Sequence, residues 1–201
     1  MWLRAKGPRC TSERVKPGAL LLTPGAGSSR DHPSLVAVER AVAPLPVARV
    51  DFPYRREGRR APDRAPKLIA CVREEAAALV ARAHVNPRRL VLGGRSMGGR
   101  MCSMAVAEGL PARGLVLISY PLHPPGRPDR LRVEHLPAID VPCLFVSGSR
   151  DAFGTPDELE AATAAIAGDV THVWIDGAGH GLARADERVA AEVTGWLATL
   201  R

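Results

Sequence analysis

The hydrophobic positions of this chain fall into short apolar runs that alternate with longer segments of helical spacing. Such runs predict strands that are buried on both faces, as in a parallel sheet. Five of them are apolar almost throughout, and a sixth alternates between apolar and polar positions. The predicted strands are residues 19–23, 47–52 (the alternating one), 90–92, 115–119, 143–147 and 171–175.

The segments between these runs carry apolar residues on one helical face. They predict helices at residues 32–43, 67–84, 100–108, 156–167 and 186–200. Regular alternation of strands and helices predicts an α/β fold, with a mostly parallel sheet and helices on both of its faces. The length of 201 residues suits a single domain. The polar residues 1–17 predict either a weak edge strand or a frayed end.

Composition narrows the function classes. The net charge is +7, but the basic residues are mostly dispersed and aromatic residues make up only 4%. We therefore expect no specific nucleic-acid partner, since stacking platforms are scarce. No apolar run is long enough for a membrane span, and the four cysteines show no C-x-x-C pairing. These features favour a cytoplasmic protein with reduced thiols. The histidines have no metal-ligand spacing, so we expect no metal site.

The segment Gly93–Gly99, with the sequence GGRSMGG, joins a predicted strand to a predicted helix. Its G-x-S-x-G pattern fits a nucleophile elbow, a sharp turn that forces Ser96 into unfavourable backbone angles and exposes its Oγ. Flanking glycines allow the strand and helix to approach closely. The alternative is an ordinary turn serine. Ser96 is a candidate nucleophile only if a base and an acid can reach it.

Two further strand ends carry the groups that a serine nucleophile needs. Asp151 follows the strand at 143–147, and His180 follows the strand at 171–175. Carboxyl ends of parallel strands meet at one edge of a sheet, so all three side chains can converge. We assign His180 as the base and Asp151 as the acid that orients it, with Asp176, Asp129 and Asp140 as rivals to Asp151. The backbone N–H groups of Met97 and Ala26 are the candidate oxyanion donors.

Several motifs together resemble the α/β-hydrolase family. They are PGAG followed by DHP, GGRSMGG, SGSRD and GAGH, and the resemblance spans about residues 18–200. It points to a group containing testis-expressed-protein-type and NSL-complex-subunit-3-type proteins, relatives of dienelactone hydrolases. The resemblance implies hydrolase chemistry on Ser96, Asp151 and His180. One departure is Pro24, since many relatives have His-Gly at the start of this loop.

The resulting prediction is a serine hydrolase without a cap domain that acts on a small ester or thioester through an acyl-enzyme. We also expect no cofactor, because acyl transfer by a serine needs none. The residues between the strands at 115–119 and 143–147 are too few for a helical cap. The alternative is an idle hydrolase fold that serves as an interaction scaffold. The candidate substrate contacts are Arg59, Arg60 and His123. Arg59 and Arg60 lie in an arginine-rich loop at residues 53–66, and the alternative interpretation of this loop is a solvated surface. Arg95, beside the serine, receives no role.

Overall fold

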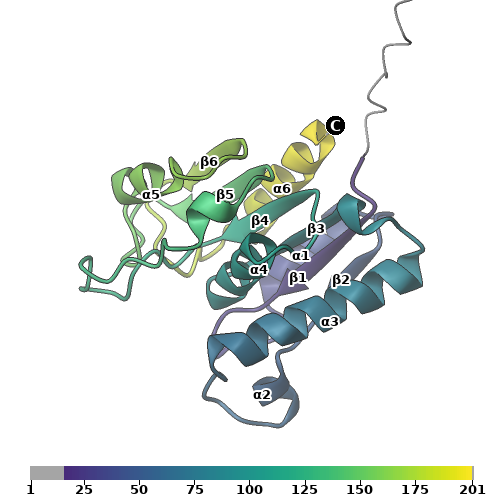
Figure 1. The fold of residues 1–201 in the computed structure, drawn as a ribbon. Coiled ribbons are helices and arrows are strands. Elements are labelled where there is room, and N and C mark those ends of the chain that lie inside the picture. The colour runs from purple at the N-terminus through teal and green to yellow at the C-terminus, as the bar shows by residue number, and fades with distance from the viewer. Residues whose placement is uncertain (1–15, 201) are drawn as a thin grey trace, which may run out of the picture.

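The computed structural model describes residues 16–200, and its centre is a six-stranded sheet (Figure 1). Every neighbouring pair of strands is parallel, and the order across the sheet is β2-β1-β3-β4-β5-β6. The strands are β1 (Ala19–Thr23), β2 (Val47–Arg49), β3 (Leu90–Arg95), β4 (Gly114–Ile118), β5 (Cys143–Gly148) and β6 (Val170–Ile175). The predicted α/β class with a parallel sheet is therefore confirmed.

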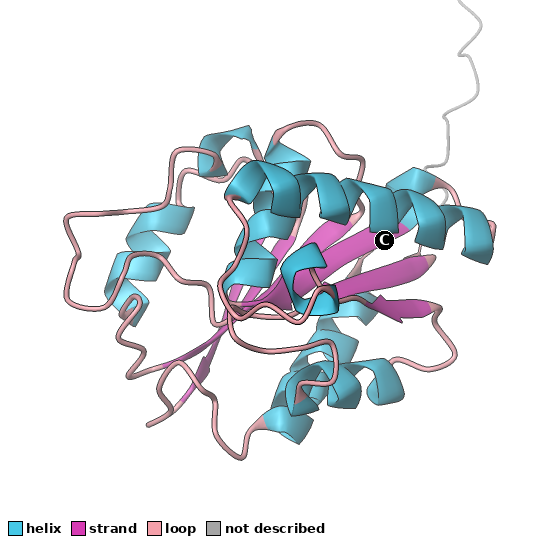
Figure 2. Ribbon diagram, turned by 90° about the horizontal axis from the view of Figure 1, so that it is seen from below, coloured by secondary structure: helices cyan, strands magenta, loops and turns pink. Residues whose placement is uncertain are grey.

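Helices cover both faces of this sheet (Figure 2). Helices α1 and α6 lie together on one face, and the remaining helices pack on the other. They are α1 (Pro33–Ala41), α2 (Pro53–Arg56), α3 (Ala65–Ala83), α4 (Met97–Ala107), α5 (Pro156–Thr163) and α6 (Asp186–Thr199), with 3-10 turns η1 (Pro87–Arg89) and η2 (Leu136–Ala138).

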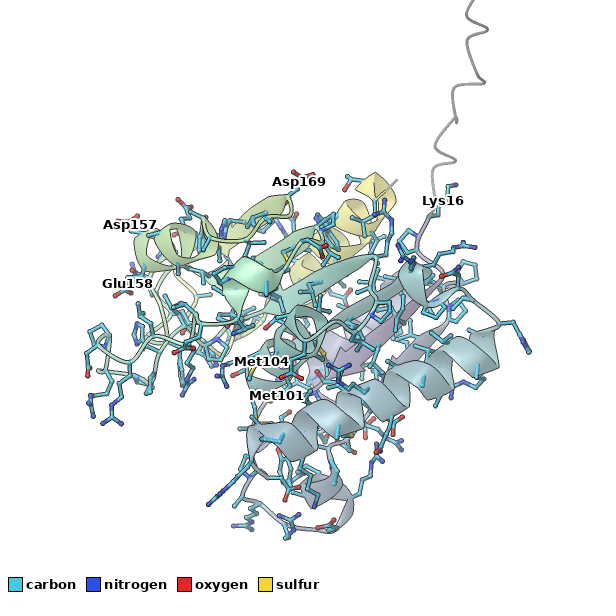
Figure 3. The ribbon with its side chains drawn as sticks, in the orientation of Figure 1. Lys16, Met101, Met104, Asp157, Glu158 and Asp169 are labelled. Carbon is cyan, nitrogen blue, oxygen red and sulfur yellow. The ribbon has the colours of Figure 1, made fainter. Side chains whose placement is uncertain are left out.

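Each buried strand feeds two hydrophobic cores because its side chains alternate between the faces. In β1, Leu20 and Leu22 belong to the core under α1 and α6, whereas Leu21 belongs to the core under α3 and α4. The second core also includes Met101 of α4, with Met104 packed against it (Figure 3). This two-sided burial explains why the strands read as unbroken apolar runs.

The structure differs from the predicted elements mainly at their ends. Helix α4 begins at Met97 rather than at residue 100, because the elbow turns directly into the helix. The short helix α2 lies in a segment predicted as a loop, where Pro53 takes the first helical position and Tyr54 is buried. Strand β2 ends at Arg49, three residues short of the prediction. The expectation for residues 1–17 falls outside the described residues, except for Lys16 and Pro17.

The fold places four loops at the carboxyl edge of the sheet. They follow β1, β3, β5 and β6, which lie close together in the sheet order. The connection from β4 to β5 contains only the η2 turn, so no cap domain is inserted there. This edge is where open α/β sheets bind their ligands.

Candidate active site

Ser96 occupies a strained turn between β3 and α4. Its backbone angles are φ 50° and ψ −120°, outside the regions that non-glycine residues favour. The turn fits only because its glycines lack side chains. A Cβ on Gly94 would lie 2.2 Å from Thr23 Oγ1, and one on Gly98 would lie 2.5 Å from the Pro24 carbonyl oxygen. The local geometry therefore holds Ser96 at the tip of the elbow, as the sequence pattern predicts.

A continuous hydrogen-bonded chain runs from Ser96 through His180 to Asp151. Ser96 Oγ lies 2.8 Å from His180 Nε2, and His180 Nδ1 lies 2.8 Å from Asp151 Oδ2. Asp151 is only 3% exposed, and the Phe153 backbone N–H donates to its Oδ1 over 2.9 Å. A carboxylate beside Nδ1 favours the tautomer whose Nε2 can accept the serine proton. The arrangement can thus activate the Ser96 hydroxyl.

Two neighbours that the sequence left without a role fix the position of His180. The Phe153 ring stacks on the imidazole with the ring centroids 4.0 Å apart. Arg95 Nη2 donates to the His180 carbonyl oxygen over 2.7 Å. The Arg95 side chain is buried, and burial lowers its pKa while Asp186 and Asp151 oppose that shift. Arg95, the residue before the nucleophile, therefore links the elbow to the loop that carries the imidazole.

A cavity of about 400 Å³ opens beside the Ser96 hydroxyl. The residues predicted as oxyanion donors, Ala26 and Met97, both line it. The loop that carries Ala26 passes so close to the nucleophile that a Cβ on Gly25 would lie 3.3 Å from Ser96 Cβ. The full lining is Ala26, Ser96, Met97, Arg100, Pro121, Arg132, Phe153 and His180.

The residues predicted as substrate contacts do not line this cavity. Arg59 pairs with Glu57 and Asp63 within its own loop, and Arg60 is exposed. The structure thus places both away from Ser96, with Arg59 in a network of surface ion pairs. The cavity takes its arginines from elsewhere, namely Arg100 of α4 and Arg132 of the β4–β5 connection. Arg100 could have been found from the sequence, since it lies one helical turn after Ser96.

His123 is buried away from the cavity lining. Its Nδ1 donates to the carbonyl oxygen of Pro124 over 2.8 Å, and its Nε2 lies 3.5 Å from Glu158 Oε2 in the first turn of α5 (Figure 3). None of the rival acids, Asp176, Asp129 and Asp140, forms a hydrogen bond with His180 within residues 16–200. Asp176 accepts a hydrogen bond from Ser149, and Asp129 pairs with Arg127 on the surface.

Within residues 16–200, no three or more His, Cys, Asp or Glu side chains gather in a way that could hold a metal ion. The three described cysteines, Cys71, Cys102 and Cys143, are free and buried. No helix in the described part of the chain combines the length and the apolar character that a membrane span requires.

Several solved structures of other proteins share this fold. A hydrolase of the alpha/beta superfamily from Xanthomonas campestris is 22% identical, with 91% of this chain and 99% of that chain covered and a TM-score of 0.69. A dienelactone hydrolase from Anabaena variabilis is 21% identical, with 92% and 88% covered and a TM-score of 0.71. Est1E from Butyrivibrio proteoclasticus is 17% identical, with 94% and 90% covered and a TM-score of 0.69.

The family comparison extends over most of the sequence. Residues 16–194 match the family described as "Alpha/beta hydrolase domain". The matched range includes the elbow and the loops that carry Asp151 and His180. The chain therefore belongs to the alpha/beta hydrolase domain family.

Proposed function

We propose that this protein is a serine hydrolase that cleaves a small carboxylic ester or thioester through an acyl-enzyme. The observation that carries the proposal is the chain of contacts Ser96 Oγ–His180 Nε2 and His180 Nδ1–Asp151 Oδ2, each 2.8 Å long. Burial of Asp151 supports it, because a carboxylate shielded from water orients the imidazole and stabilises the imidazolium more strongly. The narrower resemblance to the testis-expressed and NSL-complex-subunit-3 type stays a prediction.

The reaction would proceed in two steps, acylation of Ser96 and hydrolysis of the acyl-enzyme. Ser96 Oγ attacks the carbonyl carbon of the ester while His180 Nε2 takes the hydroxyl proton. The oxyanion forms next to the N–H groups of Met97 and Ala26. Collapse breaks the bond to the alcohol or thiol, which leaves with the proton from His180. A water molecule then attacks the acyl carbonyl while His180 takes one of its protons. Collapse breaks the Ser96 Oγ–carbon bond, His180 returns the proton to Ser96 Oγ, and the carboxylic acid departs.

Fluorophosphonate labelling tests the nucleophile directly. We expect the wild-type protein to be labelled on Ser96, and Ser96→Ala to be unlabelled. The chain offers a matched control in Ser103, whose Oγ lies 2.7 Å from His135 Nε2. Ser103 is fully buried and its histidine has no carboxylate hydrogen-bond partner among residues 16–200. Ser103→Ala should therefore be labelled as well as the wild type.

Turnover of 4-nitrophenyl esters tests the base. His180→Gln should lower kcat by at least about 1000-fold, the scale on which loss of a triad member acts. Absence of labelling in a well-folded wild-type sample would contradict the proposal. That result would favour the alternative, an idle hydrolase fold that acts as an interaction scaffold.

A further inference from the structure

Two arginine side chains line the cavity beside Ser96, and the proposed reaction gives neither of them a task. They are Arg100 and Arg132, which come from different parts of the chain. Among residues 16–200, neither guanidinium forms an ion pair with a carboxylate, although this protein pairs arginine with acid at many other places. Arg100 Nε is buried and has no hydrogen-bond partner in that range. Arg132 Nη1 donates to the Pro121 carbonyl oxygen over 3.4 Å, which leaves its charge without a carboxylate partner. The cavity lining thus includes two cations that no described carboxylate pairs.

Both side chains are carried by fixed backbone. Arg100 lies in the first turns of α4, where its N–H donates to the Ser96 carbonyl oxygen over 3.1 Å. The backbone of Arg132 is held on both sides: its N–H donates to the Leu122 carbonyl oxygen over 2.8 Å, and its own carbonyl accepts from Tyr120 Oη over 2.9 Å. The backbone of both arginines is therefore held in place at the edge of the cavity that Ser96 lines.

The two positive charges repel each other. Burial, followed by the positive charge of Arg100, lowers the pKa of Arg132. The same charge helps burial to lower the pKa of His135, whose Nε2 lies 2.7 Å from Ser103 Oγ of α4, to about 4. An anion bound by both guanidinium groups would relieve the repulsion and could accept a hydrogen bond from Arg100 Nε, which has no partner within residues 16–200. Guanidinium matches a carboxylate especially well, because both are planar and can form two parallel hydrogen bonds.

We propose that Arg100 and Arg132 form a subsite for a carboxylate carried by the ester substrate, so that the enzyme prefers anionic esters over neutral ones. This inference rests on the proposed function, because it concerns the substrate attacked by Ser96. The subsite would place the scissile carbonyl at the serine by holding the other end of the substrate. A loss of the arginines should therefore act on the anionic substrate far more than on its neutral counterpart.

Two pairs of matched esters locate the carboxylate. The first pair is mono-4-nitrophenyl glutarate and its methyl ester, which differ by a charge on the acyl side. The second is 4-acetoxybenzoate and its methyl ester, which differ on the leaving-group side. We expect a higher kcat/KM for the anionic member of at least one pair, and that pair identifies the side of the scissile bond on which the arginines lie.

The ratio of kcat/KM for the anionic ester to kcat/KM for the neutral ester then serves as the readout. Arg100→Gln and Arg132→Gln should each lower this ratio by about 10- to 100-fold, the scale of a lost charge-assisted hydrogen-bond pair. The ratio for Arg132→Lys should lie between those of the wild type and Arg132→Gln, because lysine keeps the charge but cannot form the bidentate pair. Arg130→Gln is the matched control, since Arg130 is exposed on the same loop and does not line the cavity.

The proposal is overturned if both arginine variants keep the wild-type ratio, or if Arg130→Gln lowers it equally, which would indicate general charge attraction. This failure is distinct from failure of the proposed function, because neutral esters would still be hydrolysed and Ser96 still labelled. A binding measurement is independent of turnover. Monomethyl glutarate should bind Ser96→Ala measurably by calorimetry, and the double variant Ser96→Ala, Arg132→Gln at least about 10-fold more weakly. Equal binding to both proteins would also overturn the subsite.

Discussion

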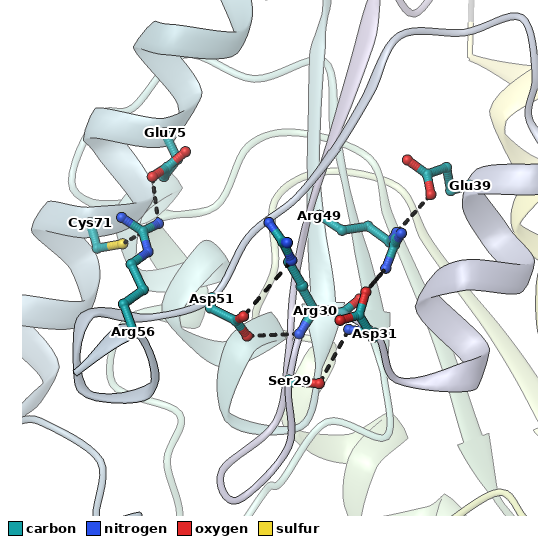
Figure 4. Close-up of polar contacts among 9 residues, drawn as sticks. All are labelled: Ser29, Arg30, Asp31, Glu39, Arg49, Asp51, Arg56, Cys71 and Glu75. Carbon is teal, nitrogen blue, oxygen red and sulfur yellow. Dashed lines mark hydrogen bonds and ion pairs between the residues drawn. The ribbon is translucent and has the colours of Figure 1, made fainter. Parts of the chain in front are cut away.

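The arginines at β2 and those beside Ser96 stand in opposite electrostatic surroundings. At β2, Arg49 pairs with Glu39 over 2.7 Å and with Asp31 over 2.9 Å, and Arg56 of the neighbouring α2 pairs with Glu75 (Figure 4). In the cavity, Arg100 and Arg132 face each other's charge and form no ion pair within residues 16–200. Arg100 lies on helix α4, and Arg132 lies in the β4–β5 connection, where hydrogen bonds to Leu122 and Tyr120 hold its backbone.

The contrast separates structural arginines from those available to a ligand. A guanidinium that already has carboxylate partners contributes modestly to the fold and offers little to a substrate. A guanidinium held without a partner costs stability, and such costs are typical of binding and catalytic sites. This explains why an arginine-rich loop is a poor guide to function: Arg59 has two acids close to it in sequence, Glu57 and Asp63.

Arg95 belongs to neither group, because it is buried and donates to a backbone carbonyl. Of the substitutions that test this comparison, Arg95→Met has the largest expected effect. Arg95→Met removes the hydrogen bond to the His180 carbonyl and frees the loop that carries the imidazole. We expect kcat to fall by about 10- to 100-fold, the cost of a misplaced catalytic group, with KM nearly unchanged. Steady-state kinetics on neutral and anionic esters measure the split.

The pattern across substrates distinguishes Arg95 from the cavity arginines. Arg95→Met should affect neutral and anionic esters equally, since it acts on His180 and not on the substrate. Partial recovery of kcat in Arg95→Lys would fit a positioning role. A loss confined to anionic esters would instead place Arg95 in the carboxylate subsite and contradict its role in positioning His180.

His135 reports on the unpaired cavity arginines through the pH dependence of stability. Its pKa falls from 6.5 to about 4 on folding, because of burial and then the charge of Arg100. The unfolded chain therefore binds more protons between these values, so stability is fully present above pH 6.5 and is lost as the pH falls toward 4. Replacing His135 by Asn should flatten this loss by on the order of 2 kcal/mol, allowing for solvent screening.

Urea unfolding of the wild type and His135→Asn at several pH values between 4 and 7 measures this difference. The other histidines with lowered pKa, His32 and His172, are present in both proteins, so their contribution cancels. A bound carboxylate should shrink the effect, because it offsets the charge of Arg100. Parallel pH profiles for the two proteins would show that His135 does not experience that charge.

Paired and unpaired arginines should also differ in their effect on stability, though by less. Arg49→Met leaves two carboxylates without their cation and should lower the free energy of unfolding by about 1 kcal/mol. Arg132→Gln relieves repulsion with Arg100 and should leave stability unchanged or slightly raised. Denaturant unfolding at neutral pH compares them. Greater destabilisation by Arg132→Gln than by Arg49→Met would reverse the assignment of structural and ligand-facing arginines.

Much of the architecture could be predicted from the sequence because its signals are local or periodic. Five strands lie where apolar runs predict them, the alternating segment at 47–52 contains β2, and five predicted helices are present with shifted ends. The errors have physical causes. Helix α2 is a single short turn that its neighbours stabilise through buried Tyr54, and no helical periodicity can develop over four residues. The sequence predicts a later start for α4 than Met97, because glycines weaken the helical signal after Ser96.

The candidate site divides in the same way. By itself, the sequence determined the elbow around Ser96 and the order of serine, aspartate and histidine at strand ends, since steric rules and parallel topology act whatever the distant packing. Only the tertiary structure decided that Asp151 rather than Asp176 contacts His180, that Arg95 binds the His180 carbonyl, and that Arg100 and Arg132 share a cavity. Those pairings depend on where long side chains from separate segments find room and charge partners, which no local pattern encodes.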